Sequence, residues 1–124
     1  MRPALYIETS VVSYLTARPS RDLVTAARQQ LTEAWWQARR SSYDLLISPL
    51  VLEAADAGDA RAAEARLGAL EGIPLIEPAP EADALAERLL RDVPLPEKAA
   101  ADAAHIAVAT AAGVDYLLTW NFKH

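Results

Sequence analysis

Short apolar segments alternate along the chain with longer segments of mixed apolar and polar residues. The apolar segments end abruptly in polar residues or proline, as buried β-strands do, whereas the longer segments carry apolar residues at helical spacing. The expected strands are 4–7, 43–47, 73–76 and 115–118. The expected helices are 11–17, 21–40, 60–70 and 81–91, with one more from residue 49 to a break at 57–59 and a last one from residue 96 to Gly113.

Strands that alternate with helices predict a parallel sheet joined by right-handed crossovers. The chain shows neither repeats nor a linker of distinct composition. We therefore expect a single domain over residues 1–124. Its predicted fold class is α/β, with three α/β/α layers and a mostly parallel central sheet of four or five short strands flanked by helices.

The composition is that of a soluble globular protein, with 52% hydrophobic and 23% charged residues and no cysteine. No apolar run approaches the roughly 20 residues that span a bilayer, and the first residues lack the apolar stretch of a secretory signal. We expect a cytoplasmic protein without a membrane segment. The net charge of −5 argues against a protein that coats nucleic acid through a positive field. It does not exclude an enzyme that contacts nucleic acid through a metal ion.

Four oxygen-bearing side chains follow or flank the expected strands. Glu8 and Asn121 come just after the first and last strands, Glu53 lies one turn into a helix, and Asp102 lies in the small, apolar segment AADAAHIAVA. Ligands of open α/β sheets bind beyond the carboxyl ends of the strands, so these side chains could converge there. Their hard oxygens suit Mg²⁺ or Mn²⁺ rather than zinc. Spacing alone does not separate this hypothesis from a chance distribution of acids.

Other interpretations of single residues stay open at this level. Glu8 could instead be a solvated acid in the first turn of a helix, with Thr9 or Ser10 as the cap. For His105 we favour a hydrogen-bonded packing role over a catalytic one. Trp35 and Trp36 are adjacent on one helix, so we expect that they cannot both face one core and that one contacts a neighbouring helix or a partner.

Three stretches in a fixed order resemble the PIN-domain family. They are YIETSVVSYL, SPLVLEAADAGD and DAAHIAVATAAGVDYLLTWN, and together they cover essentially the whole chain. They look closest to the VapC-type ribonucleases of bacterial toxin–antitoxin pairs. The resemblance implies a parallel sheet flanked by helices, and acids that bind Mg²⁺ or Mn²⁺. It also implies hydrolysis of RNA phosphodiesters to 5′-phosphate and 3′-hydroxyl ends.

Residue by residue, the resemblance assigns a complete site. The family's first three acids fall on Glu8, Glu53 and Asp102, which would bind the metal, and its fourth falls on Asn121, with Thr9 and Thr119 as supporting hydroxyls.

Two of these positions depart from the family pattern, which has Asp at the first and an acid at the last. Glu8 is longer by one methylene and Asn121 is neutral, so the resemblance implies weaker metal binding, a single ion or reduced activity. Domains of the family commonly continue with another helix and an edge strand, and this chain ends at His124.

The leading hypothesis is therefore a metal-dependent endoribonuclease, the toxin of a toxin–antitoxin pair. Its implied partners are an RNA substrate, a cognate antitoxin and a second copy of the chain in a homodimer. The alternative is a catalytically weak or inactive PIN-like module whose role is protein association. A phosphotransfer or hydrolase domain is remoter, because the chain carries neither a glycine-rich phosphate loop nor a nucleophile elbow.

Overall fold

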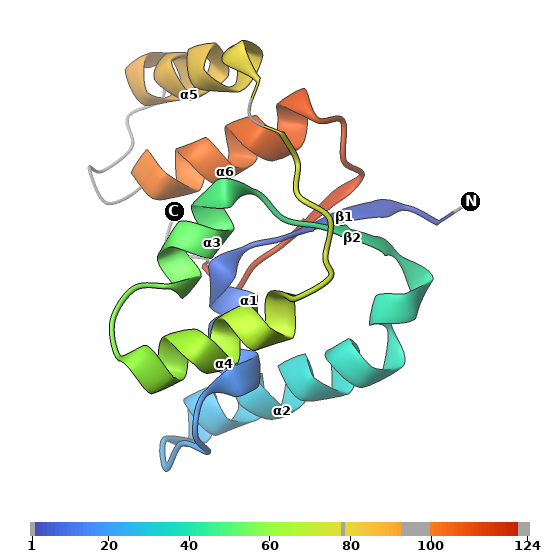
Figure 1. Ribbon diagram of the computed structural model, residues 1–124, viewed down its shortest axis with the longest axis vertical. Coiled ribbons are helices and arrows are strands. Elements are labelled where there is room, and N and C mark those ends of the chain that lie inside the picture. The colour runs from blue at the N-terminus through green and yellow to red at the C-terminus, as the bar shows by residue number, and fades with distance from the viewer. Residues whose placement is uncertain (1, 78, 93–99, 122–124) are drawn as a thin grey trace.

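The computed structural model describes residues 2–77, 79–92 and 100–121 (Figure 1). Within these ranges the protein forms a mixed α/β fold of six α-helices and three strands. In chain order the elements are β1 (Ala4–Ile7), α1 (Thr9–Thr16), α2 (Leu23–Ala38), the 3₁₀ helix η1 (Arg40–Ser42), β2 (Asp44–Leu46), α3 (Pro49–Ala55), α4 (Ala60–Leu70), α5 (Pro80–Asp92), α6 (Ala100–Ala111) and β3 (Tyr116–Leu118).

The three strands form one parallel sheet in the order β2-β1-β3. β1 is central, with Leu5 opposite Leu45 on one side and Ile7 opposite Leu118 on the other. The predicted α/β class and parallel pairing are confirmed. The same register places the C-terminal ends of β1 and β3 side by side at the carboxyl end of the sheet.

The prediction of a strand at 73–76 was wrong, because this segment forms only an isolated parallel bridge between Leu75 and Ile47. Ile47 N–H donates to the carbonyl of Pro74, and Ile76 N–H donates back to Ile47. Pro74 has no N–H of its own to extend the ladder. Among the described residues the sheet therefore has three strands, fewer than the four or five expected.

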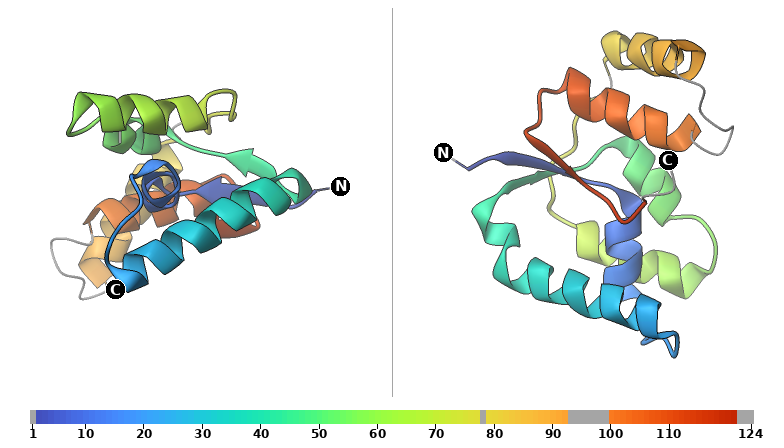
Figure 2. Two further views of the ribbon diagram at one scale, coloured as in Figure 1. Left: turned by 90° about the horizontal axis from the view of Figure 1, so that it is seen from below. Right: turned by 180° about the vertical axis from the view of Figure 1, so that it is seen from behind.

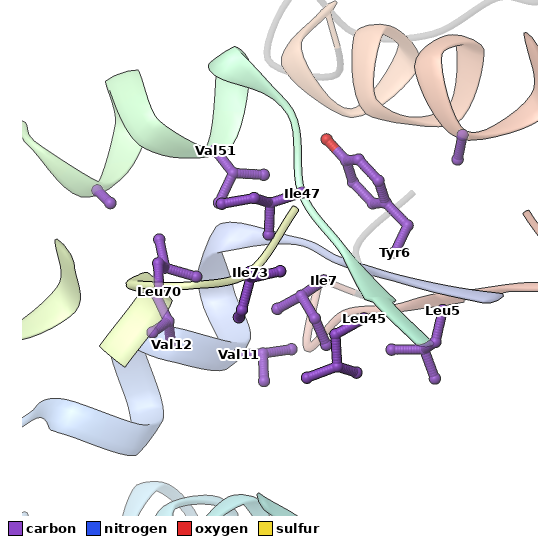
Figure 3. Packing of buried hydrophobic residues seen from close by; sticks show 12 residues of the cluster. Leu5, Tyr6, Ile7, Val11, Val12, Leu45, Ile47, Val51, Leu70 and Ile73 are labelled. Carbon is purple, nitrogen blue, oxygen red and sulfur yellow. The ribbon is translucent and has the colours of Figure 1, made fainter. Parts of the chain in front are cut away.

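Helices lie on both sides of the sheet. α5 and α6 pack together on one side, and α1, α2 and α4 lie on the other (Figures 1 and 2). Successive side chains of a strand point to opposite faces. Leu5 and Ile7 accordingly point into the core on the α1 side, whereas Tyr6 points toward α6 (Figure 3). β1 is buried on both faces, as its apolar sequence predicted.

Most helix boundaries follow local signals. Pro49 opens α3 at its first turn, and α4 has the predicted bounds. Gly113 follows α6 with a φ of 71°, a left-handed conformation that glycine adopts without the clash of a Cβ atom. One cap differs from expectation. α1 begins at Thr9 instead of residue 11, and Glu8 is its N-cap. The expected start of the last helix at 96 lies outside the described residues.

The expectation for the two adjacent tryptophans was wrong, since both pack partly buried against the same core cluster. Trp35 stacks on Tyr43, and Trp36 lies under the guanidinium of Arg40, 4.3 Å from the ring centre. Neighbouring helix positions point about 100° apart. Indole rings are wide enough to reach one core from both directions.

In the described part of the chain, every helix is too short or too polar to cross a lipid bilayer.

Candidate functional site

The carboxyl edge of the sheet brings together residues from the two ends of the chain. Ile7 pairs with Leu118, so the residues that follow them, Glu8 and Thr119, emerge side by side. The backbone N–H of Glu8 donates to the carbonyl of Leu118 at 3.1 Å. The Thr119 hydroxyl donates to Glu8 Oε1 at 2.6 Å. The expected convergence of these strand ends is confirmed.

Glu8 accepts hydrogen bonds from two further donors in α1. Its Oε2 accepts from the backbone N–H of Ser10 at 3.1 Å, and its Oε1 accepts from the Ser10 hydroxyl. A carboxylate at a helix N-terminus satisfies otherwise unpaired N–H groups and interacts favourably with the helix dipole. Glu8 is thus both the N-cap of α1 and an acid at the carboxyl end of the sheet. The alternative interpretation, a solvated acid in the first turn with Thr9 or Ser10 as the cap, was wrong.

Asp102 lies in the first turn of α6, where the helix dipole also favours a negative charge. The side-chain amide of Asn121 spans this carboxylate, with Nδ2 2.8 Å from Oδ1 and 2.9 Å from Oδ2. The backbone N–H of Asn121 donates to Thr119 Oγ1 at 3.0 Å. A continuous chain of hydrogen bonds therefore runs from Glu8 through Thr119 and Asn121 to Asp102.

Trp120 anchors the segment that carries Thr119 and Asn121. Its backbone N–H donates to the Ser10 hydroxyl at 2.8 Å, and its indole N–H donates to the Thr32 hydroxyl at 2.7 Å. Arg28 lies over the same ring, 5.5 Å from its centre. These contacts bind the loop after β3 to α1 and α2, which fixes the site residues on either side of Trp120.

A buried polar cluster lies under the two acids. The Tyr6 hydroxyl is 2.7 Å from Ser48 Oγ and 2.6 Å from His105 Nδ1. Burial raises the pKa of Tyr6 to about 12, with Glu8 adding to the rise and Ser48 opposing it. Burial lowers the pKa of His105, and the negative charges of Glu8 and Asp102 offset part of that effect. The preferred sequence-based role for His105, a hydrogen-bonded packing residue, is confirmed.

Glu53 stands apart from this arrangement. It lies exposed on α3, and no hydrogen bond joins it to Glu8 or Asp102 within the described ranges. Across those ranges, no three His, Asp or Glu side chains are close enough together to hold a metal ion. The structure thus brings together Glu8, Asp102 and Asn121 with Thr119.

Thr9, the other hydroxyl expected to support the site, is buried next to Glu8. Its Oγ1 has no hydrogen-bond partner among the residues that the structure describes. An unpaired buried hydroxyl costs about 1–3 kcal/mol, so such groups usually bind water or a ligand. This hydroxyl therefore has unused hydrogen-bonding capacity at the first residue of α1.

Sequence reasoning missed three residues around the site. Ser10 had been considered only as a cap, although a hydroxyl two positions after an acid can bond back to it. Tyr6 and Ser48 were assigned to a strand and to the end of a strand. A tyrosine inside an apolar strand was the available signal, because a buried phenol needs a hydrogen-bond partner.

The donor set suits a hard divalent cation. Mg²⁺ typically binds through one or two carboxylates and keeps several waters, so Glu8, Asp102 and the Asn121 amide could hold it without a third acid. By ligand type, these two carboxylates and the amide fit such an ion.

Comparison of the chain with protein-family models finds no matching family, and comparisons with curated proteins and with solved structures find no similar protein.

Proposed function

We propose that this protein is a metal-dependent endoribonuclease with a PIN-like fold, which hydrolyses RNA phosphodiester bonds as the toxin of a toxin–antitoxin pair. One observation carries the proposal. The hydrogen-bonded chain Glu8–Thr119–Asn121–Asp102 joins two carboxylates at the carboxyl edge of a parallel sheet, where open α/β sheets bind ligands.

In this proposal each site residue has a defined task. Glu8 and Asp102 would hold Mg²⁺ or Mn²⁺, and Glu53, exposed on α3, is the further acid that the resemblance assigns to the ion. Asn121 orients Asp102 and water, and Thr119 holds Glu8 toward the ion. The bound ion supplies an activated water and neutralises charge on the scissile phosphate.

The neutral Asn121 limits the charge of the site. Two carboxylates and an amide carry less negative charge than four acids, which favours a single ion over a pair. The chain as a whole is negative, with a net charge of −5. RNA therefore needs the bound cation as its attractive contact at the acids.

The decisive experiment compares the wild-type protein with Asp102→Asn and with Glu33→Gln, a control that removes one exposed acid on α2. We expect calorimetry to show saturable Mn²⁺ binding by the wild type and the control, but not by Asp102→Asn. Cleavage of single-stranded RNA should follow the same order. Undiminished cleavage by a folded Asp102→Asn protein would exclude the assignment.

A second candidate function, protein association, is favoured by apolar side chains on α2. Leu23 is 85% exposed, Val24 61% and Leu31 62%. Leu31 also lines a mostly apolar cavity of about 370 Å³ that reaches Thr119 and Trp120. Trp35 and Trp36, one of which was expected to contact a neighbouring helix or a partner, both pack partly buried on the core.

The two candidate functions separate by mutation. Leu31→Ser should weaken self-association in sedimentation experiments and leave Mn²⁺ binding unchanged if association is a distinct role of α2. Asp102→Asn should abolish Mn²⁺ binding and leave self-association unchanged.

A further inference from the structure

The buried cluster of Tyr6, Ser48 and His105 joins three separate elements behind the candidate site. Tyr6 is on β1, Ser48 is the N-cap residue of α3, and His105 is on α6. The Tyr6 hydroxyl bridges the other two at 2.7 and 2.6 Å. The three side chains are almost completely buried, with exposed fractions of 0%, 1% and 6%.

Each member of the cluster is close in sequence to one of the predicted acids. Tyr6 is followed two positions later by Glu8, and alternate strand residues share a face. His105 follows Asp102 by three positions, which places both on one side of α6. Ser48 begins the helix that carries Glu53. The bridging hydroxyl therefore connects the three acid-bearing elements at a single point.

Small apolar side chains make up most of the buried face of α6. Its fully buried apolar residues are Ala103, Ala107 and Ala109, and His105 is the largest buried side chain of this helix among the described residues. Methyl groups make a smooth surface that does not interlock strongly with a neighbour. The directional bond from Tyr6 to His105 thus adds a specific contact to the packing of Val108 on the core and of α6 on α5, and helps to specify the rotation of α6.

Figure 3 shows the direction in which the Tyr6 side chain points. Tyr6 leaves β1 toward α6 with its hydroxyl outermost, whereas Leu5 and Ile7 point the opposite way. The rigid phenol ring therefore bridges the central strand β1 and the helix α6, which carries Asp102.

We propose that Tyr6, Ser48 and His105 form a positioning cluster that holds Asp102 in register with Asn121 and Glu8, and so sets the metal affinity of the site. These residues act through the acids and do not contact the substrate. The part that concerns metal affinity rests on the proposed function, whereas the orientation of α6 does not.

Three variants probe the cluster, and one variant serves as control. Tyr6→Phe removes the bridging hydroxyl, and His105→Leu removes its hydrogen-bond partner on α6. His105→Asn keeps a hydrogen-bonding atom near the position of Nδ1, because both atoms of its amide are bonded to the equivalent carbon and can accept or donate. Tyr116→Phe is the control, since Tyr116 is half-exposed at the opposite end of β3 from Thr119 and its ring contacts Tyr43 outside the cluster.

The first measurement is the side-chain amide resonance of Asn121 in nitrogen-15 spectra of the metal-free protein. If the cluster holds Asp102 in place, Tyr6→Phe and His105→Leu should shift this resonance and speed its proton exchange. His105→Asn and Tyr116→Phe should resemble the wild type. Folded Tyr6→Phe and His105→Leu proteins with an unchanged Asn121 amide would overturn the proposal.

The second measurement is the Mn²⁺ dissociation constant by calorimetry. Loss of groups that orient metal ligands typically weakens affinity 10- to 100-fold, and we expect a loss in that range for Tyr6→Phe and His105→Leu. Wild-type affinity in both variants would overturn the part that concerns metal binding. If the wild type binds no Mn²⁺, the proposed function fails. The Asn121 amide resonance then still tests whether the cluster orients α6. If Tyr6→Phe does not fold, Ser48→Ala takes its place in both measurements. This variant removes only the hydrogen bond between Ser48 and the Tyr6 hydroxyl.

Discussion

Asn121 and Asp102 face each other across the candidate site, and the single amide nitrogen of Asn121 lies 2.8 and 2.9 Å from the two carboxylate oxygens. The amide occupies the place where the resemblance to PIN domains leads one to expect another acid. It neutralises no charge, but it holds Asp102 by donating to it.

Replacing this amide with an acid tests the electrostatic balance of the site. In Asn121→Asp, two carboxylates would meet without a proton donor, and we expect a loss of about 1 kcal/mol in the free energy of unfolding without metal. A divalent cation should bind this variant more tightly. Thermal melts with and without Mn²⁺ should therefore show a larger metal-induced rise in melting temperature than in the wild type. A smaller rise would contradict a cation site at Asp102.

Glu8 should contribute to stability as well as to the site. Its carboxylate accepts from Ser10 N–H, the Ser10 hydroxyl and the Thr119 hydroxyl. Glu8→Gln replaces one acceptor oxygen with an amide donor, and we expect a loss of about 1–2 kcal/mol, as for other helix caps. Urea denaturation measures this change.

Glu53→Gln is the matched control, because Glu53 is exposed and the described structure shows no hydrogen bond to it. Its stability should change by no more than about 0.5 kcal/mol. Equal losses in the two variants would contradict the capping role of Glu8.

The buried imidazole of His105 should make stability depend on pH. Burial lowers its pKa below the ordinary 6.5, against the opposing charges of Glu8 and Asp102, and its other polar neighbour is the neutral Tyr6 hydroxyl. Between about pH 6.5 and the lower folded-state pKa, the unfolded chain binds more protons than the folded one. The free energy of unfolding contributed by His105 should therefore fall as the pH is lowered through that window.

Comparison with His105→Asn isolates this effect from the other titrating groups. The stability difference between wild type and variant, measured by urea denaturation without metal, should shrink on acidification from about pH 7.5 to about pH 5. A difference that stayed constant or grew would mean that His105 is not buried in its neutral form.

Two glycines should respond to alanine in opposite directions. Gly113 has a φ of 71° after α6, where an added Cβ is strained, so Gly113→Ala should cost about 1 kcal/mol. Gly68 lies inside α4 with nothing within 4 Å of an added Cβ, so Gly68→Ala should stabilise by about 0.5–1 kcal/mol. Chemical denaturation of both variants tests the helix boundaries, and a loss of stability in Gly68→Ala would contradict a regular helix at that position.

The helices and strands that sequence predicted correctly are those with local physical causes. Ala4–Ile7 is a dense apolar run, and Ala60–Leu70 shows helical periodicity after an N-cap aspartate. Pro49 begins α3 and Gly113 follows the end of α6, each through the constraints of its own backbone. Such signals act within a few residues, so they are readable without knowledge of the tertiary structure.

The failures involve partners that are distant in the chain. Segment 73–76 has the composition of a strand, but it makes only one bridge to Ile47. Trp35 and Trp36 both reach the core, because the surrounding helices leave room for two indoles. Hydrophobic periodicity predicts neither the single bridge of 73–76 nor the burial of both tryptophans. Each depends on the distance to a strand or helix that is remote in sequence.

The amino-acid sequence by itself determined the α/β class, most element boundaries and the placing of polar residues after buried strands. Tertiary structure decided which of those residues meet. The parallel register of β1 and β3 placed Thr119 against Glu8, and the packing of α6 placed Asp102 against Asn121. Tyr6 met His105 across 99 positions for the same reason. Backbone propensities act locally, whereas strand register and helix rotation depend on the whole packed core.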